Sequence, residues 1–268
     1  MATLAFLTQH GKLAAVQAPL RLAGYETHVV DGFDTDTLGT FTGETARAGS
    51  QLEAATAKAK MAAQLSGAGY GLGSEGSFGP DPYVGLSAWA REVLVWWDAQ
   101  AQRAVFALVQ GAQTNYAQCT ASSWQQAKGF ALKAGFPAHG IIVGKPGELA
   151  FSKACDTWEL LEQQVGRALL TGSVWLETDM RAHRNPTRMG QIAHCAQQLA
   201  TLLQCACPAC SAPGFGEETP IAGAVCENCG LPTGALRAKR VVCNACGHGE
   251  VIELHATVPA SRCERCNP

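Results

Sequence analysis

Charged side chains are scarce in this chain, and neither sign of charge dominates. They make up 16% of its 268 residues, with 20 Lys and Arg against 22 Asp and Glu and a net charge of −2. Proteins that bind nucleic acid or anionic membranes usually carry a strongly basic field, so this balance argues against both as principal partners. Aromatic residues are also few, at 7%, but 47% of the residues are apolar, which excludes wholesale disorder.

Long apolar runs are missing as well. None reaches the roughly 20 residues that span a bilayer. The start, Met1–Leu7, has neither the basic segment nor the cleavage site of a signal peptide. We therefore expect Met1–Leu7 to hold a first strand, and we expect a cytoplasmic protein with no membrane partner.

Strand and helix signals alternate up to Leu203, where short Gly-, Pro- and Cys-rich turns replace them. This order predicts an α/β domain over residues 1–203, with a mixed central sheet flanked by helices, and a small module over residues 204–268. Long loops are expected over Gly32–Gly49 and Glu75–Pro82. The expected strands are Thr3–Thr8, Glu26–Val30, Tyr70–Ser74, Val93–Asp98, Ala104–Gln110, Ile141–Val143 and Val174–Glu177. The expected helices are Lys12–Ala23, Gln51–Ser66, Ser122–Ala134, Thr157–Leu170 and Thr187–Leu203.

Cysteine is plentiful, and its placement is the strongest signal in the sequence. Eight of the 12 cysteines form four Cys-x-x-Cys pairs: Cys207 with Cys210, Cys226 with Cys229, Cys243 with Cys246, and Cys263 with Cys266. Such pairs place two thiolates on one edge of a zinc tetrahedron, so we predict two structural zinc ions per chain. A redox dithiol or a disulfide scaffold is the alternative.

Repetition in the pairs predicts how they combine. The third and fourth pairs repeat the first and second after 36 and 37 residues, which favours sequential sites, the first four cysteines and then the last four. Small buried apolar side chains are expected at the remaining cysteines, which are Cys119, Cys155, Cys195 and Cys205.

Basic residues in the cysteine-rich module cluster only at Arg237-Ala-Lys-Arg240. The segment from Cys205 onward holds five basic and six acidic residues. A structural role or a protein contact is therefore the expected use of the module, with nucleic acid as the weaker alternative.

Four patches of the first domain combine glycine or charge in ways that suit a phosphate or a metal. Gly11 and Lys12 follow the first strand and open a helix, where an anion is favoured. Glu75 sits among glycines at the end of a strand, and Glu53 opens a helix; either carboxylate suits Mg²⁺. The segment Glu177–Arg188 contains several basic side chains that together suit the binding of an anion, and they are called here the arginine clamp. Its expected ligand-binding side chains are Arg181, His183, Arg184 and Arg188.

Each patch also has a structural interpretation. Lys12 can be solvated on an ordinary turn, Glu53 can pair with Lys60 on a helix surface, and Glu75 can lie in a Gly-rich turn. The segment Glu177–Arg188 can be a salt-bridged loop. Pattern alone favours the structural interpretation for Glu53.

The whole chain resembles an uncharacterised bacterial family of unknown function. The shared strings are Gly39-Thr-Phe-Thr-Gly-Glu44, Ser74-Glu-Gly-Ser-Phe-Gly-Pro80, Glu177-Thr-Asp-Met-Arg-Ala-His183, Asn185-Pro-Thr-Arg-Met189, and the run Cys207–Phe215.

More distantly, residues 1–203 resemble the inosine triphosphate pyrophosphatases, which hydrolyse nonstandard purine nucleoside triphosphates with Mg²⁺. Their opening motif is similar to Thr8-Gln-His-Gly-Lys12, their Gly-x-Thr-Phe helix is echoed by Gly39–Phe41 with Glu53–Ala59, and their late Ser-His-Arg resembles Ala182–Arg184. Their Asp-Asp-Ser-Gly turn corresponds to Ser74–Ser77, where one Glu replaces two Asp.

This resemblance implies a nucleotide substrate and a possible magnesium site. Lys12 would contact the phosphates, helped by His10 and Gly11, while Glu53 and Glu75 would hold Mg²⁺. Arg184 would complete the catalytic set. The alternatives are a nonenzymatic nucleotide sensor, a nucleic-acid adaptor, and a zinc-stapled scaffold for protein contacts. A homodimer is among the assemblies left open.

Overall fold

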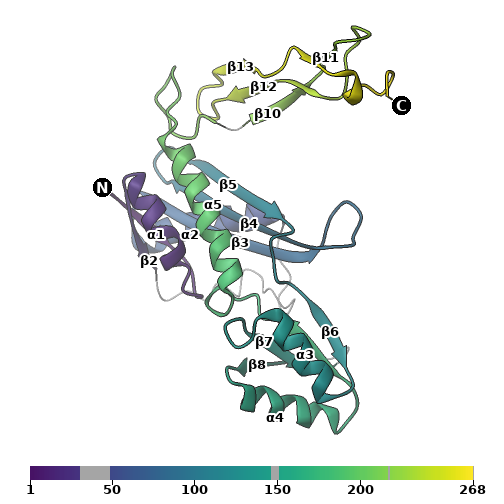
Figure 1. The fold of residues 1–268 in the computed structure, drawn as a ribbon. Coiled ribbons are helices and arrows are strands. Elements are labelled where there is room, and N and C mark those ends of the chain that lie inside the picture. The colour runs from purple at the N-terminus through teal and green to yellow at the C-terminus, as the bar shows by residue number, and fades with distance from the viewer. Residues whose placement is uncertain (31–48, 146–150, 217, 268) are drawn as a thin grey trace. The chain divides into compact units, whose positions relative to one another are not determined.

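The computed structural model describes residues 1–30, 49–145, 151–216 and 218–267 (Figure 1). They form two compact units, Met1–Ala200 and Thr201–Pro268, called here the N-terminal and C-terminal units. The expected loop Gly32–Gly49, with the string Gly39–Glu44, falls outside the described residues except for its last residue. Within the described residues, no helix has the length and apolar character that crossing a membrane requires.

A five-stranded mixed sheet forms the larger part of the N-terminal unit. Its order is β2-β1-β3-β4-β5, in which β1 runs parallel to both β2 and β3. The other pairs are antiparallel hairpins. The strands are β1 (Ala2–Phe6), β2 (Tyr25–Val29), β3 (Tyr70–Pro80), β4 (Ala88–Asp98) and β5 (Arg103–Gly111).

The second sheet of this unit has four antiparallel strands in the order β6-β9-β7-β8. They are β6 (Gln118–Ala121), β7 (Ile141–Gly144), β8 (Phe151–Cys155) and β9 (Val174–Thr178). One face is covered by α3 (Trp124–Ala134) and α4 (Trp158–Leu169), which share an apolar core with β7 and β9. The prediction of one central sheet was therefore wrong. Apolar segments reveal strands but not their partners, and β6 and β8 are short strands that lack a continuous apolar run.

Helix ends follow the expected capping chemistry. The helix α2 (Gln51–Ser66) starts with a capping box between Ser50 and Glu53 and ends at the left-handed Gly67. The helix α1 (Leu13–Leu22) continues through Pro19. The last helix, α5 (Pro186–Gln204), starts where the Oδ1 atom of Asn185 accepts the amide of Arg188.

Glycines let α2 lie directly against β3. A Cβ atom at Gly71 would stand 1.9 Å from the carbonyl oxygen of Ala59, and one at Gly73 would stand 1.9 Å from that of Ala55. Side chains alternate between the faces of a strand, so Gly71, Gly73 and Glu75 all face α2. The α2 residues Ala55 and Ala59 also pack against Val93 and Val95 of β4.

The strand β3 continues to Pro80, so the prediction of a loop over Glu75–Pro82 was wrong. Glycine-rich sequence disfavours a strand interior, but Gly73–Pro80 is paired residue by residue with β4. The turn instead spans Asp81–Ser87. The Asp81 carboxylate closes it by accepting the amides of Tyr83, Val84, Leu86 and Ser87.

The C-terminal unit is thin and almost free of large buried side chains. Its three-stranded antiparallel sheet has the order β10-β12-β13, and β11 pairs with β14 in parallel. The strands are β10 (Glu218–Ala222), β11 (Val225–Cys226), β12 (Leu236–Val242), β13 (Gly249–Glu253) and β14 (Thr257–Val258). Among its described residues, the buried ones are cysteines, alanines, two valines and Leu203.

The contact between α2 and β3 predicts a specific sensitivity to one methyl group. We expect Gly73→Ala to lower the free energy of unfolding by about 1–3 kcal/mol, because the new methyl group meets helix backbone that cannot rotate away. Gly79→Ala is the matched control on the same strand, since a Cβ atom there meets nothing within 4 Å. Urea unfolding measures both variants, and equal stabilities would contradict the assigned packing.

Candidate functional site

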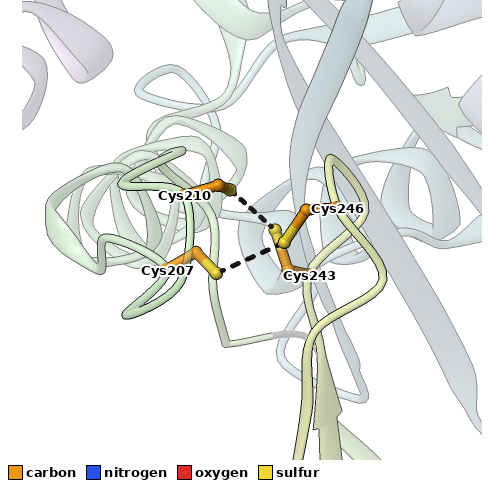
Figure 2. Close-up of side chains that lie close together, drawn as sticks. All are labelled: Cys207, Cys210, Cys243 and Cys246. Carbon is orange, nitrogen blue, oxygen red and sulfur yellow. Dashed lines mark hydrogen bonds between the residues drawn. The ribbon is translucent and has the colours of Figure 1, made fainter.

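Eight cysteines of the C-terminal unit gather into two groups of four. The first group is Cys207, Cys210, Cys243 and Cys246 (Figure 2), and the second is Cys226, Cys229, Cys263 and Cys266. All of them are free thiols, with no disulfide among them. Within the described residues, these are the groups of three or more His, Cys, Asp or Glu side chains whose ligand atoms lie close enough to hold a metal ion.

The sulfur spacing fits zinc. In the first group the sulfurs of Cys207 and Cys246 are 3.8 Å apart, and those of Cys210 and Cys243 are 3.7 Å apart. The second group has sulfur pairs at 3.9 and 3.8 Å. Four Zn–S bonds of about 2.3 Å in a tetrahedron place the sulfurs about 3.8 Å apart. The groups can therefore hold two zinc ions, as the cysteine pattern predicted.

The prediction of sequential sites was wrong, because the groups interleave. The first pair of cysteines joins the third, and the second joins the fourth. The strand β12 is the reason: it lies between the second and third pairs, and its extended backbone advances about 3.3 Å per residue. This carries Cys243 away from Cys229. Spacing along the chain is the same for both arrangements and could not distinguish them.

Backbone amides favour the thiolate form of one cysteine in each group, Cys226 and Cys243. Gly230 and Gly247 follow their Cys-x-x-Cys pairs with φ angles of +69° and +74°. Their amides donate to the carbonyls of Cys226 and Cys243. The amides of Ala245 and Cys246 lower the pKa of Cys243 to about 6, and such a thiolate is the form that binds metal.

The four remaining cysteines differ in burial. Cys155 and Cys195 are buried as expected, whereas Cys119 is half-buried and Cys205 is exposed. The prediction of a buried side chain was therefore wrong for Cys205. It directly follows the last turn of α5, where apolar periodicity no longer reports a packed face.

In the N-terminal unit, the structure buries Lys12 at the end of β1. Its Nζ atom donates to Ser74 Oγ at 3.2 Å, and only 8% of the residue is exposed. Burial, followed by the nearby charge of Arg188, lowers the pKa of Lys12 to about 7. An ammonium group held this way is costly to the fold unless something compensates for it.

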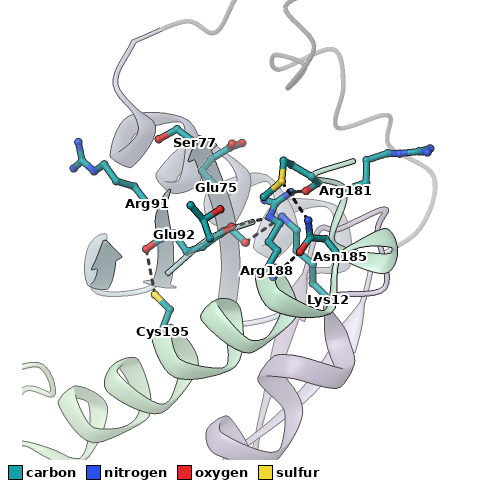
Figure 3. A network of polar contacts seen from close by, with 12 residues as sticks. Lys12, Glu75, Ser77, Arg91, Glu92, Arg181, Asn185, Arg188 and Cys195 are labelled. Carbon is teal, nitrogen blue, oxygen red and sulfur yellow. Dashed lines mark hydrogen bonds and ion pairs between the residues drawn. The ribbon is translucent and has the colours of Figure 1, made fainter. Parts of the chain in front are cut away.

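An ion pair between Arg188 and Glu92 lies beside Lys12 (Figure 3). The Nε atom of Arg188 donates to Glu92 Oε1 at 2.7 Å, while Glu92 Oε2 is buried and has no hydrogen-bond partner among the described residues. Gly76 makes room for this pair, because a Cβ atom there would clash with both side chains. Arg188 also donates to the carbonyl of Met180 and lies over the ring of Phe78.

Glu75 points to the opposite face of β3 from Ser74 and Gly76. There it forms an ion pair with Lys58 of α2, and both side chains are buried. Gln51 donates to the carbonyl of Glu75 at 3.0 Å. The two faces remain electrostatically close, since Glu75 and Lys58 both act on the pKa of Lys12.

Glu53 caps the start of α2, a structural role that differs from the surface pair with Lys60 that its pattern suggested. Its carboxylate accepts the amide of Ser50 at 2.6 Å at the exposed start of α2, which lowers its pKa. Glu53 and Glu75 belong to no metal-binding group among the described residues. Glu53 caps a helix and Glu75 is paired with Lys58. These two carboxylates therefore do not form a magnesium site together.

His10 and His183 pack against each other near Lys12, with ring centroids 5.2 Å apart. Burial and then the charge of Lys12 lower the pKa of His10 to about 4, so this ring is neutral at pH 7. Gly11, between His10 and Lys12, has a φ of +66° and lies beside the Cβ of His183.

The predicted arginine clamp is dispersed. Arg181 binds Asp179 through two nitrogens, and Arg184 binds Asp156 at 2.6 Å. Each arginine, like Arg188, therefore has its own carboxylate. The structure brings Lys12, His10, Gly11, His183 and Arg188 together, and leaves Glu53 and Arg184 with other partners.

Two polar residues of this cluster were missed from the sequence, Ser74 and Glu92. Glu92 offered a signal, because it is an acidic residue in the apolar run of β4 and a buried carboxylate needs a partner. Ser74 offered none, since serine is common in Gly-rich segments.

Paired substitutions can verify the interleaved zinc sites. Cys207→Ser with Cys226→Ser should remove both zinc ions, because each change disables a different site. Cys207→Ser with Cys243→Ser should remove one, because both changes fall in the same site. Metal content per chain is measured by inductively coupled plasma mass spectrometry, and sequential sites would give the opposite result for the two double variants.

Comparison with known proteins assigns a family without an activity. A family model described as "Domain of unknown function (DUF6671)" matches residues 58–268, which include the Lys58–Glu75 pair, Arg188 and all eight paired cysteines. No curated protein and no solved structure matches the chain. The resemblance to inosine triphosphate pyrophosphatases thus stays a prediction. Because this match covers well over half of the sequence, the chain belongs to the DUF6671 family of unknown function.

Proposed function

We propose that the N-terminal unit binds a nucleoside polyphosphate, with the phosphates on Lys12. The observation that carries this proposal is a buried lysine that donates to a neutral hydroxyl, Ser74 Oγ. Burying an ammonium group without a carboxylate partner destabilises a fold. A bound anion would compensate for that cost, and this is the simplest reason for placing the lysine there.

The topology supports the same position. From β1 the chain passes through α1 to β2 on one side, and then through α2 to β3 on the other side of β1. Ligands of open α/β sheets bind where the strand order reverses, beyond the carboxyl ends of the strands. Lys12 follows β1 at this point. It also begins α1, whose first turn has no side-chain cap, so its amides can face an anion.

Neutral rings near Lys12 suit the remainder of such a ligand. The pKa values of His10 and His183 are both lowered, chiefly by burial, so neither ring adds charge at pH 7. Flat neutral rings can stack on a base, while Lys12 supplies the charge for the phosphates.

Hydrolysis is a second candidate, supported by Glu75. This buried carboxylate follows Ser74, the residue that accepts from Lys12, and it forms an ion pair with Lys58. Because the two glutamates do not fit magnesium in this arrangement, binding without turnover is the primary proposal.

The C-terminal unit supports a separate protein-contact role. Every residue of β13 is exposed, including Val251 and Ile252. Zinc at both ends of so thin a sheet would supply the stability that its small core lacks.

Lys12→Ala should weaken nucleotide binding about tenfold to a hundredfold, the effect of losing one charge-assisted contact. Calorimetric titration with nucleoside triphosphates and with inorganic tripolyphosphate, each with and without Mg²⁺, measures the affinity. Pyrophosphate release in the same mixtures separates hydrolysis from binding. Lys128→Ala, at an exposed position of α3, is the matched control. Absence of binding by the unmodified protein would contradict the proposal.

The cost of burying Lys12 should make the free energy of unfolding depend on pH. Its pKa is 10.5 in the unfolded chain and about 7 in the folded one, so only the unfolded chain holds this proton between those values. The penalty is therefore complete below pH 7 and disappears as the pH rises toward 10. Lys12→Met should raise the free energy of unfolding by about 1–4 kcal/mol near pH 6 and by much less near pH 10. Urea unfolding at both pH values measures this, and a pH-independent loss of stability would show that Lys12 stabilises the fold.

A further inference from the structure

We propose that the groove between β6 and α3 binds a short extended peptide that ends in a free carboxylate. The groove has a volume of about 780 Å³, and seven consecutive residues, Thr114–Thr120, form one wall. The other wall is one side of α3. This site lies in the four-stranded sheet, and the inference does not depend on the nucleotide proposal.

The strand β6 is at the edge of its sheet, because β9 is the only strand in the described part of the chain that pairs with it. In an antiparallel pair, alternate residues direct their backbone groups toward the partner strand. The amide of Thr178 donates to the carbonyl of Ala117, so the backbone groups of Gln118 and Thr120 point away from β9. An extended peptide is the ligand whose spacing matches such an edge, because its own amides and carbonyls alternate in the same way.

The wall formed by α3 leaves space for an extended peptide beside β6. Gln126, Gly129, Phe130 and Lys133 share one face of the helix at intervals of three and four residues. Gly129 leaves the middle of this wall open, since a Cβ atom there would meet nothing within 4 Å. Phe130 supplies an apolar surface for a peptide side chain.

One end of the groove is closed and basic. The Nδ2 atom of Asn115 donates to the carbonyl of Ala134 at 3.2 Å, which joins the end of α3 to the segment before β6. Lys133 stands at this end, and none of the described residues that line the groove is Asp or Glu. A chain that stops there and carries one negative charge fits this end, which favours a C-terminal carboxylate. A single cation is too little for a nucleic acid.

The test uses the full-length protein and a pool of short random peptides with free carboxyl ends. Bound peptides are eluted and sequenced, and their affinity is then measured by fluorescence anisotropy. We expect amidation of the carboxylate to weaken binding about tenfold to a hundredfold, as should Lys133→Glu. Lys128→Glu on the same helix is the matched control, because Lys128 does not line the groove.

Filling the groove provides a test that does not depend on charge. Gly129→Leu should abolish peptide binding, because the new side chain would occupy the open middle of the wall. It should leave folding intact, since leucine favours a helix more than glycine does. Gly166→Leu is the matched control, at a glycine of α4 whose Cβ atom would also meet nothing within 4 Å.

Three outcomes would overturn the proposal. The first is a pool from which no peptide binds more tightly than about 1 mM. The second is binding that Gly129→Leu leaves unchanged. The third is concentration-dependent dimerisation that Gly129→Leu abolishes, which would show that a second copy of the chain occupies the edge of β6.

Discussion

The ion pair between Arg188 and Glu92 joins the two sheets of the N-terminal unit. Arg188 belongs to α5, which follows the four-stranded sheet, and Glu92 belongs to β4 of the five-stranded sheet. Cys195, two turns further along α5, donates to the carbonyls of Glu92 and Ala107. Because a buried charge that loses its partner is strongly destabilising, this pair holds the start of α5 in one position. Asn185 extends the connection by binding Asn115 and the carbonyl of Asp179.

The basic side chains near this ion pair differ in their partners. Arg181, Arg184 and Arg188 each have a carboxylate, and Lys58 has Glu75. Lys12 donates instead to a hydroxyl. Charges that are already neutralised position the chain, whereas Lys12, which has no acidic hydrogen-bond partner among the described residues, is available to a ligand. This contrast makes Lys12 the centre of the proposed phosphate site and assigns the arginines a largely structural part.

Local sequence signals predicted local structure well and long-range pairing poorly. The helix Gln51–Ser66 was predicted with the bounds that the structure has, because helical periodicity involves residues close in sequence. The strands β4 and β5 were likewise expected, whereas the division into two sheets was not. Among the candidate site residues, Lys12 and Arg188 were identified, but the partner of Arg188 lies 96 positions away in the chain. Pairing over such a distance depends on the packed fold and leaves no periodic trace in the sequence.

The metal groups illustrate the same distinction. Residue types and spacing within each pair were sufficient to predict the ligands, since two cysteines three positions apart share one metal by local geometry. Which pairs combine depends on where β12 carries the third pair, a property of the whole unit.

Interleaving has a consequence for biosynthesis. As the polypeptide leaves the ribosome, Cys207 and Cys210 emerge with Cys226 and Cys229 before either pair meets its correct partner. A nascent chain of this length presents four cysteines that belong to different groups. One metal ion bound by all four would stabilise a non-native pairing. The first group is complete only once Cys246 has been synthesised, and the second only once Cys266 has been, so neither site can form in its native arrangement before its later cysteine pair has emerged.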